Sequence, residues 1–306
     1  MKVYKNLEQF DIQKDTVVTI GNFDGCHIGH RKIISRVVEL SKKYNFEPVL
    51  FTFNNHPMKH FGANIELIMS DEKKAEVIFS LGIKHLISVD FTDEFANMSA
   101  ELFAREILSK KLNARYVVVG YDYRFGKKRQ GDFELLKMLS SKLGFNAIKI
   151  DKVEIDNITV SSTNIRKLIK NGDIELANKM LGREFEMSGI VTDGDNLGRL
   201  IGYPTANISF DNYIIPKYGV YITKTVVGEK KYPSLTNVGI RPTIKDSNEL
   251  RIETYILDFD SDIYGKKIDI CFLKYLREEM KFETFDELKK KIDEDVRKAK
   301  DFFKIP

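Results

Sequence analysis

The segment GNFDGCHIGH occupies residues 21–30, and its neighbours decide how it folds. Residues 16–20 (TVVTI) form an apolar, β-branched run, which predicts a strand. Residues 28–44 carry apolar side chains at helical spacing, which predicts a helix. Open parallel sheets bind ligands where strands end and helices begin, and glycines there let backbone approach a ligand. Because a helix N-terminus also attracts anions, the segment predicts a phosphate site in an α/β domain.

The two histidines of this segment, His27 and His30, are three residues apart and share one face of the first helical turn. In either protonation state an imidazole can donate a hydrogen bond to a phosphate oxygen. Two other interpretations are a plain strand–helix turn and a two-histidine metal site. The sequence nearby offers no convincing third and fourth metal ligand. Phosphate chemistry is favoured by the combination of the glycines, Asn22, Phe23 and Asp24 with both histidines.

The rest of the chain predicts two domains. In the first half, strands expected at 48–53, 84–89, 115–120 and 147–150 alternate with helices expected at 71–81, 99–112 and 132–143. Such alternation predicts βαβ units and a mostly parallel sheet. Two short helices, broken at 171–172, are expected within 162–181. The boundary is expected near 182–184, which gives domains 1–183 and 184–306.

The second half changes to short strands separated by Gly, Pro, Asn and Asp. Strands are expected at 185–192, 220–227, 232–238, 251–258 and 267–272, followed by a helix at 285–303. This spacing predicts a small antiparallel barrel or sandwich.

Composition sets limits on these interpretations. The chain has 306 residues, of which 42% are apolar and 31% charged, so packed domains are expected rather than disorder. Its net charge of +4 suits phosphorylated small molecules and does not require nucleic acid. The two cysteines, Cys26 and Cys271, exclude a disulfide framework and a cysteine-based zinc site. Without a long apolar run or a signal-like start, we expect a soluble cytoplasmic protein.

Two further segments of the first half suggest nucleotide binding. Residues 161–166 (SSTNIR) open a helix with three hydroxyls and Arg166, more than helix capping alone requires. Residues 120–132 (GYDYRFGKKRQGD) are basic and bracketed by glycines, which predicts a mobile lid over phosphates or flavin. The competing interpretation of this lid is a solvated basic loop. His56-Pro57 follows a predicted strand and is equally well explained as a rigid turn.

A second ligand site is predicted within residues 189–207 (GIVTDGDNLGRLIGYPTAN). Four glycines and Arg199 suit a loop that folds over phosphates. In extended backbone, the side chains of Thr205 and Asn207 point the same way and offer hard oxygen donors, which Mg²⁺ prefers. The alternative is a plain turn. The sequence contains no Walker A motif, which argues against a P-loop kinase.

These motifs together resemble a known family. Residues 21–30 resemble the HxGH signature of nucleotidylyltransferases and, in longer form, the adenylyltransferase module of prokaryotic bifunctional riboflavin kinase/FAD synthetases. Residues 161–166 are similar to the second nucleotide motif of that module, and residues 195–207 to the riboflavin kinase signature. The stretches 216–221, 237–243 and 277–282 follow in family order, with Glu278 where proline is usual. The resemblance covers residues 16 to about 300.

The resemblance implies a Rossmann-like nucleotidylyltransferase domain (1–183) and a riboflavin kinase-like antiparallel β-barrel with a terminal helix (184–306). In the first, it implies that His27 and His30 stabilise the charge that develops during transfer. The implied ATP-binding residues are Gly21, Asn22, Phe23, Asp24, Gly29, Ser161, Ser162, Thr163 and Arg166. The implied flavin or lid residues are His56, Asp122, Arg124 and Phe125.

In the barrel, the resemblance implies that Glu253 is the general base toward the ribityl 5′-hydroxyl and that Thr205 and Asn207 hold Mg²⁺–ATP. The implied ATP-binding residues are Gly189, Gly194, Gly198, Arg199, Gly202 and Pro204. The implied flavin-side residues are Tyr218, Arg277 and Glu279.

The implied function is FAD synthesis in two steps. Riboflavin and ATP give FMN and ADP, and FMN and a second ATP give FAD and pyrophosphate. No nucleic acid or membrane is an expected partner, and the sequence does not predict an oligomeric state. One alternative is a flavin sensor without turnover, against which the intact candidate catalytic residues argue. Another is a tRNA enzyme with a related signature, against which the modest charge and the kinase-like second half argue.

Overall fold

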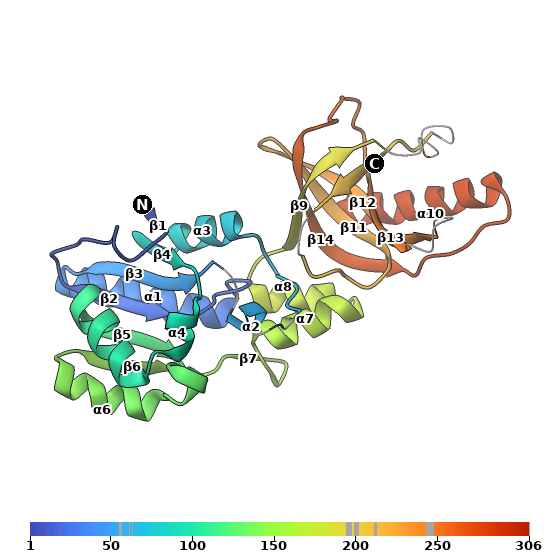
Figure 1. The fold of residues 1–306 in the computed structure, drawn as a ribbon. Helices are drawn as coiled ribbons and strands as arrows, with labels where there is room; N and C mark the ends of the chain where they lie inside the picture. The colour runs from blue at the N-terminus through green and yellow to red at the C-terminus, as the bar shows by residue number, and fades with distance from the viewer. Residues whose placement is uncertain are drawn as a thin grey trace. The chain divides into compact units, whose positions relative to one another are not determined.

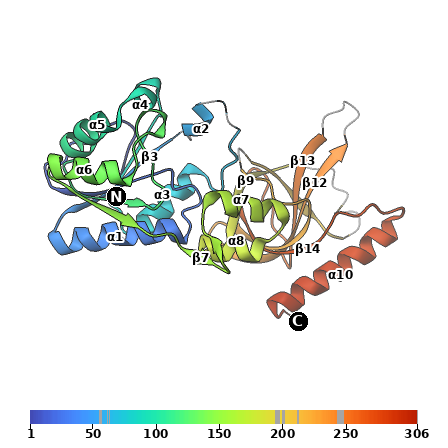
Figure 2. The same ribbon diagram turned by 90° about the horizontal axis from the view of Figure 1, so that it is seen from below.

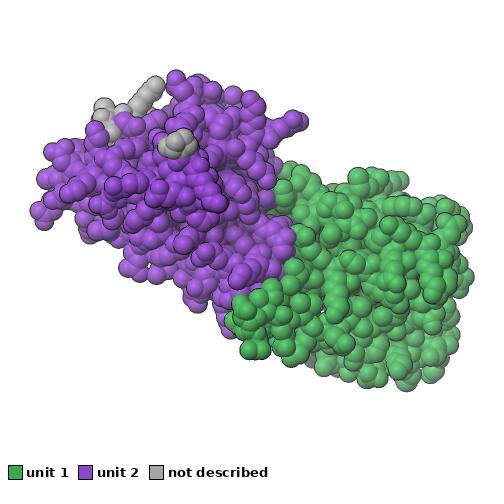
Figure 3. Space-filling view, turned by 180° about the vertical axis from the view of Figure 1, so that it is seen from behind, with its two compact units in different colours: residues 1–162 green, residues 163–306 purple. Residues whose placement is uncertain are grey.

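A computed structural model describes residues 1–54, 57–60, 62, 64–193, 198, 202–210, 213–242 and 248–305. The chain divides into two compact units, residues 1–162 and 163–306, which Figure 3 draws in different colours. Among the described residues, no helix is both long and apolar enough to cross a membrane.

Unit 1 is built on a six-stranded parallel sheet (Figure 1). Its order is β1-β4-β3-β2-β5-β6, so β3 and β4 lie on one side of β2 whereas β5 and β6 lie on the other. This reversal beside β2 is a topological switch point, where open α/β sheets bind ligands. The strands are β1 (Lys2–Tyr4), β2 (Thr16–Ile20), β3 (Glu47–Phe53), β4 (His85–Val89), β5 (Ala114–Gly120) and β6 (Asn146–Ile150).

Helices cover both faces of this sheet, because successive strand residues point to opposite sides. Val17 packs with the apolar faces of α1 (Ile28–Tyr44) and α3 (Asp71–Ser80), whereas Val18 packs on the opposite layer. That second layer contains α5 (Ala100–Leu102), the π-helix η1 (Phe103–Lys111) and α6 (Phe133–Leu143), as Figure 2 shows. The smaller elements are α2 (Pro57–His60), α4 (Asp93–Asn97), η2 (Lys127–Arg129) and the hairpin β7 (Glu154–Ile155) with β8 (Ile158–Thr159).

Helix ends in this unit follow the local capping rules. Ser99 accepts a hydrogen bond from the backbone of Leu102, which confirms it as an N-cap. Gly144 closes α6 in the left-handed conformation at φ 78°, also as predicted. The helix predicted at 99–112 is present, but most of it is a π-helix, which capping and periodicity do not predict.

Unit 2 begins at the second residue of α7 (Ser162–Asn171), which is followed by α8 (Ile174–Leu181), and the two helices are separated at Gly172 as predicted. A closed barrel follows, with neighbouring strands in the order β10-β13-β12-β11-β14-β9. The sequence allowed a barrel or a sandwich, and the structure is a barrel with one strand, β10, that was not predicted. The strands are β9 (Phe185–Thr192), β10 (Thr205–Ser209), β11 (Gly219–Val227), β12 (Lys230–Pro242), β13 (Asn248–Ile256) and β14 (Lys267–Arg277).

The two faces of the barrel wall differ in chemistry. The fully buried face carries apolar side chains such as Phe185 and Phe272 together with five linked hydroxyls, whose O···O distances are 2.6–2.9 Å, on Thr223, Thr225, Ser234, Thr236 and Thr254. The other face packs in part against the terminal helix α10 (Phe285–Phe303), as Figure 1 shows, through residues such as Leu235 and Ala299. Polar residues continue this second face beyond the helix, and they include the predicted kinase residues.

Candidate functional site

A tight turn joins β2 to α1 in unit 1, and three of its residues have left-handed backbone conformations. Phe23, Gly25 and Cys26 have φ values of 51°, 77° and 39°, all in the left-handed region. The backbone N–H of Gly21 donates to the carbonyl of Phe51 on β3 (3.2 Å). A Cβ atom at Gly21 would lie 3.1 Å from the Phe23 ring. The turn therefore lies at the carboxyl edge of the sheet, beside the switch point.

The two histidines of the turn form a stacked pair. His27 is the N-cap of α1, and its Nδ1 accepts from the backbone N–H of His30 (3.3 Å). The ring centroids are 3.6 Å apart, and the planes are inclined by 14°. A Cβ at Gly29 would lie 3.1 Å from the His27 ring, so the glycine leaves room for this ring. The predicted shared face of the first turn is confirmed.

Burial keeps both rings neutral. Desolvation lowers the pKa of His27 to about 4, and it lowers the pKa of His30 well below its usual range, with His27 as the second cause. Because His27 Nδ1 is an acceptor, the proton of the neutral ring lies on Nε2, which is left as a donor. Nδ1 of His30 is buried and has no hydrogen-bond partner among the described residues. Neutral donors of this kind suit phosphate binding better than proton abstraction.

The low pKa of His27 predicts a pH-dependent stability. An unfolded histidine binds a proton near pH 6.5, whereas folded His27 does so only near pH 4, so the unfolded state gains protons as the pH falls between these values. The stability of unit 1 should therefore fall across this window, by a His27 contribution on the order of 3 kcal/mol. Denaturant unfolding at pH 7 and pH 4.5 should show a smaller loss for His27→Asn, and an equal loss would contradict the assignment.

The segment 161–166 meets this turn at its start. The hydroxyl of Ser162 donates to the carbonyl of Asp24 (2.9 Å), which places the first residue of α7 beside the turn. The Asp24 carboxylate is buried and accepts from the backbone of Ile68 (3.1 and 3.3 Å), so it stabilises the surrounding loop. Ser161 precedes this contact, and Thr163 and Arg166 follow along the chain in unit 2. Their ATP contacts stay predictions.

Backbone hydrogen bonds hold part of the segment predicted as a lid within unit 1. Phe125 and Gly131 exchange two backbone hydrogen bonds (3.0 and 2.9 Å), and the N–H of Lys127 donates to the carbonyl of Met98 (2.8 Å). Phe125 is buried in the core, whereas Arg124 is exposed and pairs with Asp132 (3.4 Å).

These contacts do not test the flavin roles predicted for residues of unit 1. Asp122 lies beside Gly120, where a Cβ would be 3.4 Å from its carboxylate. The flavin roles of Asp122, Arg124 and Phe125 stay predictions, and His56 lies outside the described residues.

The predicted kinase residues meet on the barrel through strand register. Asn207 of β10 is paired with Glu253 of β13, which is in turn paired with Asn237 of β12. Directly paired residues share one face of a sheet, with Cβ atoms about 5 Å apart. Thr205 lies two residues before Asn207 and therefore shares this face. We call Asn207, Glu253 and Asn237 the polar row.

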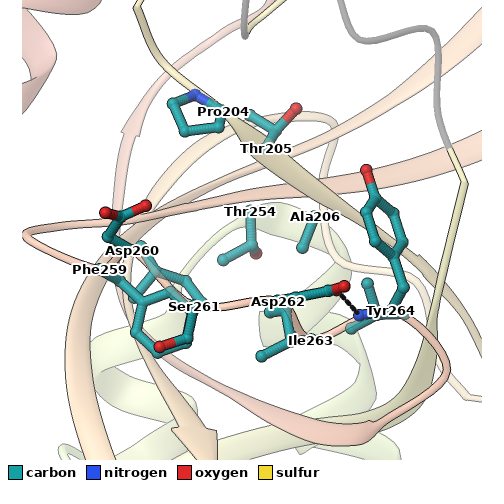
Figure 4. Close-up of a pocket in the computed structure, with 12 residues that line it drawn as sticks. Pro204, Thr205, Ala206, Thr254, Phe259, Asp260, Ser261, Asp262, Ile263 and Tyr264 are labelled. Atoms are coloured by element: carbon teal, nitrogen blue, oxygen red, sulfur yellow. Dashed lines mark hydrogen bonds between the residues drawn. The ribbon is translucent and has the colours of Figure 1, made fainter.

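A cavity of about 350 Å³ lies on the opposite face of the barrel wall from the polar row, where Ala206 and Thr254 line it (Figure 4). Its walls come from β10, β13 and the loop 259–264, which carries Asp260 and Asp262. Asp262 accepts a hydrogen bond from the backbone of Tyr264 (3.0 Å), which fixes part of this loop. Pro204 and Thr205 line the cavity as well, so it borders one of the two predicted metal residues. Its volume is in the range typical of small-ligand sites.

Among the glycines predicted to fold over phosphates, each one that the structure describes is explained by a different local feature of the backbone. A Cβ at Gly189, within β9, would lie 2.4 Å from the Ser209 carbonyl oxygen, so this glycine allows β10 to approach. A Cβ at Gly198 would lie 2.3 Å from the carbonyl oxygen of Tyr203. Gly202 adopts φ 89°, which favours glycine. Gly194 and Arg199 lie outside the described residues, and the phosphate roles of this group stay predictions.

The segment after β14 is held by the terminal helix. Arg277 forms two contacts of 2.7 Å, through Nε and Nη2, with one carboxylate oxygen of Asp295 on α10. Asp295 is buried, with 2% of its surface exposed. Two residues on, Glu279 accepts from the side-chain amide of Asn237 (3.2 Å). Tyr218 is exposed, and its carbonyl accepts from the Tyr275 hydroxyl (3.3 Å). Sequence reasoning assigned no role to Asn237 or Asp295. Only Asn237 carried a signal, as the first residue of the 237–243 stretch.

Glu278, where the family usually has proline, forms an exposed ion pair with Lys217 (2.9 Å). Exposed pairs contribute at most about 1 kcal/mol. We expect Glu278→Pro to change the rate of FMN formation less than about threefold. The exposed ion pair contributes little stability, and proline is the usual residue of the family at this position. Steady-state kinetics measures this change, with Lys217→Met as the variant that breaks the same pair. A tenfold loss in Glu278→Pro alone would show that the turn itself needs glutamate.

The comparisons agree with this two-part geometry. Residues 9–164 match the family described as FAD synthetase, and residues 181–303 match the family described as riboflavin kinase. The bifunctional riboflavin kinase/FMN adenylyltransferase of Buchnera aphidicola subsp. Acyrthosiphon pisum is 36% identical over 100% of this chain and 99% of its own. The protein of the same name from Escherichia coli is 34% identical over 95% of this chain and 94% of its own.

A solved structure also spans almost the whole chain. It is described as a macrolide-efflux protein from Streptococcus pneumoniae, and it matches with a TM-score of 0.90 and 30% identity over 98% of both chains.

A parallel-sheet unit with an HxGH turn, joined to a barrel that carries the polar row, defines a transferase with a nucleotidylyltransferase part and a kinase part. The chain belongs to the family of bifunctional riboflavin kinases/FMN adenylyltransferases. The predicted fold class, family and enzyme class are confirmed.

Proposed function

We propose that this chain makes FAD in two steps, phosphorylating riboflavin in the barrel and adenylylating FMN in the parallel-sheet unit. The observation that carries the proposal is the presence of two motifs in one chain, the stacked histidine turn in unit 1 and the polar row on the barrel. Full-length similarity to bifunctional relatives supports the order of the two activities. ATP is the proposed phosphoryl and adenylyl donor.

For adenylyl transfer, a phosphate oxygen of FMN attacks the α-phosphorus of ATP, and pyrophosphate leaves. Catalysis of this kind is positioning and charge stabilisation, without a covalent intermediate. Nε2–H of His27 donates to phosphate oxygens, and the N-terminus of α1 adds its positive end. We assign a supporting role to Arg166, on the resemblance of its motif.

For the kinase step, Glu253 accepts the proton of the ribityl 5′-hydroxyl while that oxygen attacks the γ-phosphorus of ATP and ADP leaves. Glu253 is partly exposed, and one carboxylate oxygen lies 3.5 Å from the Arg251 guanidinium. The cavity next to Thr205 is the proposed nucleotide site, because it borders the strand that carries the phosphate-side residues.

The donors on β10 fit Mg²⁺. Thr205 and Asn207 place a hydroxyl and an amide oxygen on one face of the strand, and Mg²⁺ usually takes one or two protein oxygens together with substrate phosphates. When bound, the ion would neutralise phosphate charge. Among the described residues, no cluster of three or more His, Cys, Asp and Glu side chains would form an independent metal site.

The domain limits 1–183 and 184–306 are part of the proposal. The riboflavin kinase match begins at residue 181, close to the proposed limit, whereas the FAD synthetase match ends earlier, at residue 164. The structure groups α7 and α8 with the barrel in unit 2. We also propose a cytoplasmic location, because both reactions consume ATP.

The first test is chromatography of the flavins after the pure protein is incubated with riboflavin, ATP and Mg²⁺. We expect FMN to form first and FAD to follow. FMN alone would contradict the adenylyltransferase half under these conditions. Bound riboflavin without either product would overturn both reactions and favour a flavin sensor.

A further inference from the structure

Glu279 lies against a part of β12 that is shaped for it. A Cβ atom at Gly239 would lie 1.8 Å from one carboxylate oxygen of Glu279 and 2.8 Å from the other. The carboxylate therefore occupies the space that any side chain at residue 239 would fill. Gly239 does not have a positive φ, so its backbone conformation does not require glycine. A side chain at residue 239 would therefore move the exposed end of Glu279 away from this position.

The second part of this arrangement is Asn237, two residues earlier on the same face of β12. Its amide nitrogen donates to Oε1 of Glu279 (3.2 Å), the same oxygen that lies over Gly239. A hydrogen bond to a charged acceptor contributes more than a neutral one. The Asn237 amide thus fixes the carboxylate, and Gly239 admits it.

Strand register places this arrangement next to the proposed base. Asn237 is the direct partner of Glu253, and Gly239 is the direct partner of Arg251. Arg251 is within 3.5 Å of Glu253. Glu279 therefore lies one strand away from the carboxylate that takes the proton, with a neutral amide between the two negative groups.

We propose that Asn237 and Gly239 form a seat that positions Glu279 for binding the polyhydroxylated side chain of riboflavin. The proposal rests on the proposed kinase function and adds two positioning residues to it. The seat acts on the flavin substrate and not on the nucleotide, because the nucleotide cavity is lined by β10, β13 and the loop 259–264.

The decisive experiment is a double-mutant cycle between Gly239→Ala and Glu279→Ala. The readout is the dissociation constant of riboflavin, measured by quenching of its fluorescence, together with the KM for riboflavin and for ATP. We expect Gly239→Ala to weaken riboflavin binding about tenfold, because the methyl group displaces a charged hydrogen-bond acceptor. The KM for ATP should change less than about twofold. In the Glu279→Ala background, adding Gly239→Ala should change riboflavin binding less than about twofold, because nothing remains to displace.

Asn237→Asp tests the other half of the seat. It places a carboxylate against Glu279 and should weaken riboflavin binding about tenfold or more, because repulsion replaces a hydrogen bond. In Asn237→Asp with Glu279→Gln, an amide can again donate to a carboxylate. This double variant should bind riboflavin more tightly than Asn237→Asp alone.

Additive effects in the Gly239–Glu279 cycle, unchanged riboflavin binding in Gly239→Ala, or equal losses for riboflavin and ATP would overturn the seat. The KM for ATP in the kinase reaction serves as the folding control for every variant, because it reports on the same barrel. If the wild-type protein binds riboflavin but forms no FMN, the proposed function fails, while the binding constants still decide whether the seat exists.

Discussion

Replacing Glu253 with glutamine is expected to slow FMN formation by about 100-fold or more, the scale at which a catalytic base acts. Glutamine keeps the size of the side chain but cannot accept the proton of the attacking hydroxyl. The paired positions of Asn207 and Asn237 should hold the new amide in place, so binding should change less than turnover. The measurement is single-turnover conversion of riboflavin to FMN at saturating ATP.

Two comparisons make the Glu253 result specific. Glu229→Gln makes the same chemical change at an exposed turn of the same barrel and should leave the rate unchanged. FAD formation from supplied FMN should continue in Glu253→Gln, because that reaction is assigned to unit 1. An unchanged kinase rate in the folded variant would remove Glu253 from the mechanism.

The double replacement of His27 and His30 by alanine is expected to abolish FAD formation while FMN formation persists. It removes the Nε2–H donor and the stacked partner that keeps it in place. Losing a preorganised donor to a developing charge typically costs about 100- to 1,000-fold, and here two rings are lost. The measurement is the rate of FAD formation from FMN and ATP, with the kinase rate of the same preparation as an internal standard.

Helix capping is the competing explanation for a loss in the double variant. His27→Asn retains a side-chain acceptor for the backbone of His30 but lacks the ring. If capping alone mattered, this single variant would keep its adenylyltransferase rate. We expect it to lose most of that rate. Parallel loss of both activities in a folded double variant would contradict two independent sites.

Local rules predicted the elements that depend on local sequence. The strand at 16–20 and the helix at 28–44 have the predicted bounds, because apolar periodicity and the glycine turn between them determine both. The same holds for the caps Ser99 and Gly144. Strand β10 was missed because its five residues lie between loops and are extended only by pairing with β9 and β13.

The parts of the fold and of the candidate site that the sequence did not predict depend on contacts between residues far apart in the chain. The resemblance implies a flavin or lid role for Phe125, and that role stays a prediction. The packing of Phe125 on Phe103 is a contact that no local pattern indicates. The partner of Arg277 is Asp295, which reaches it only because α10 folds back on the barrel. Asn237 becomes the neighbour of Glu253 through the register of β12 and β13, and single-sequence reasoning does not determine register.

The buried hydroxyls of the barrel have a thermal consequence. Exposing apolar surface raises the heat capacity of unfolding, whereas exposing polar surface lowers it. The barrel interior buries linked hydroxyls at 0–1% exposure on three neighbouring strands. Its heat capacity increment on unfolding is therefore smaller than the same interior would give with apolar side chains at these five positions. The stability curve of the barrel against temperature is flatter to the same extent.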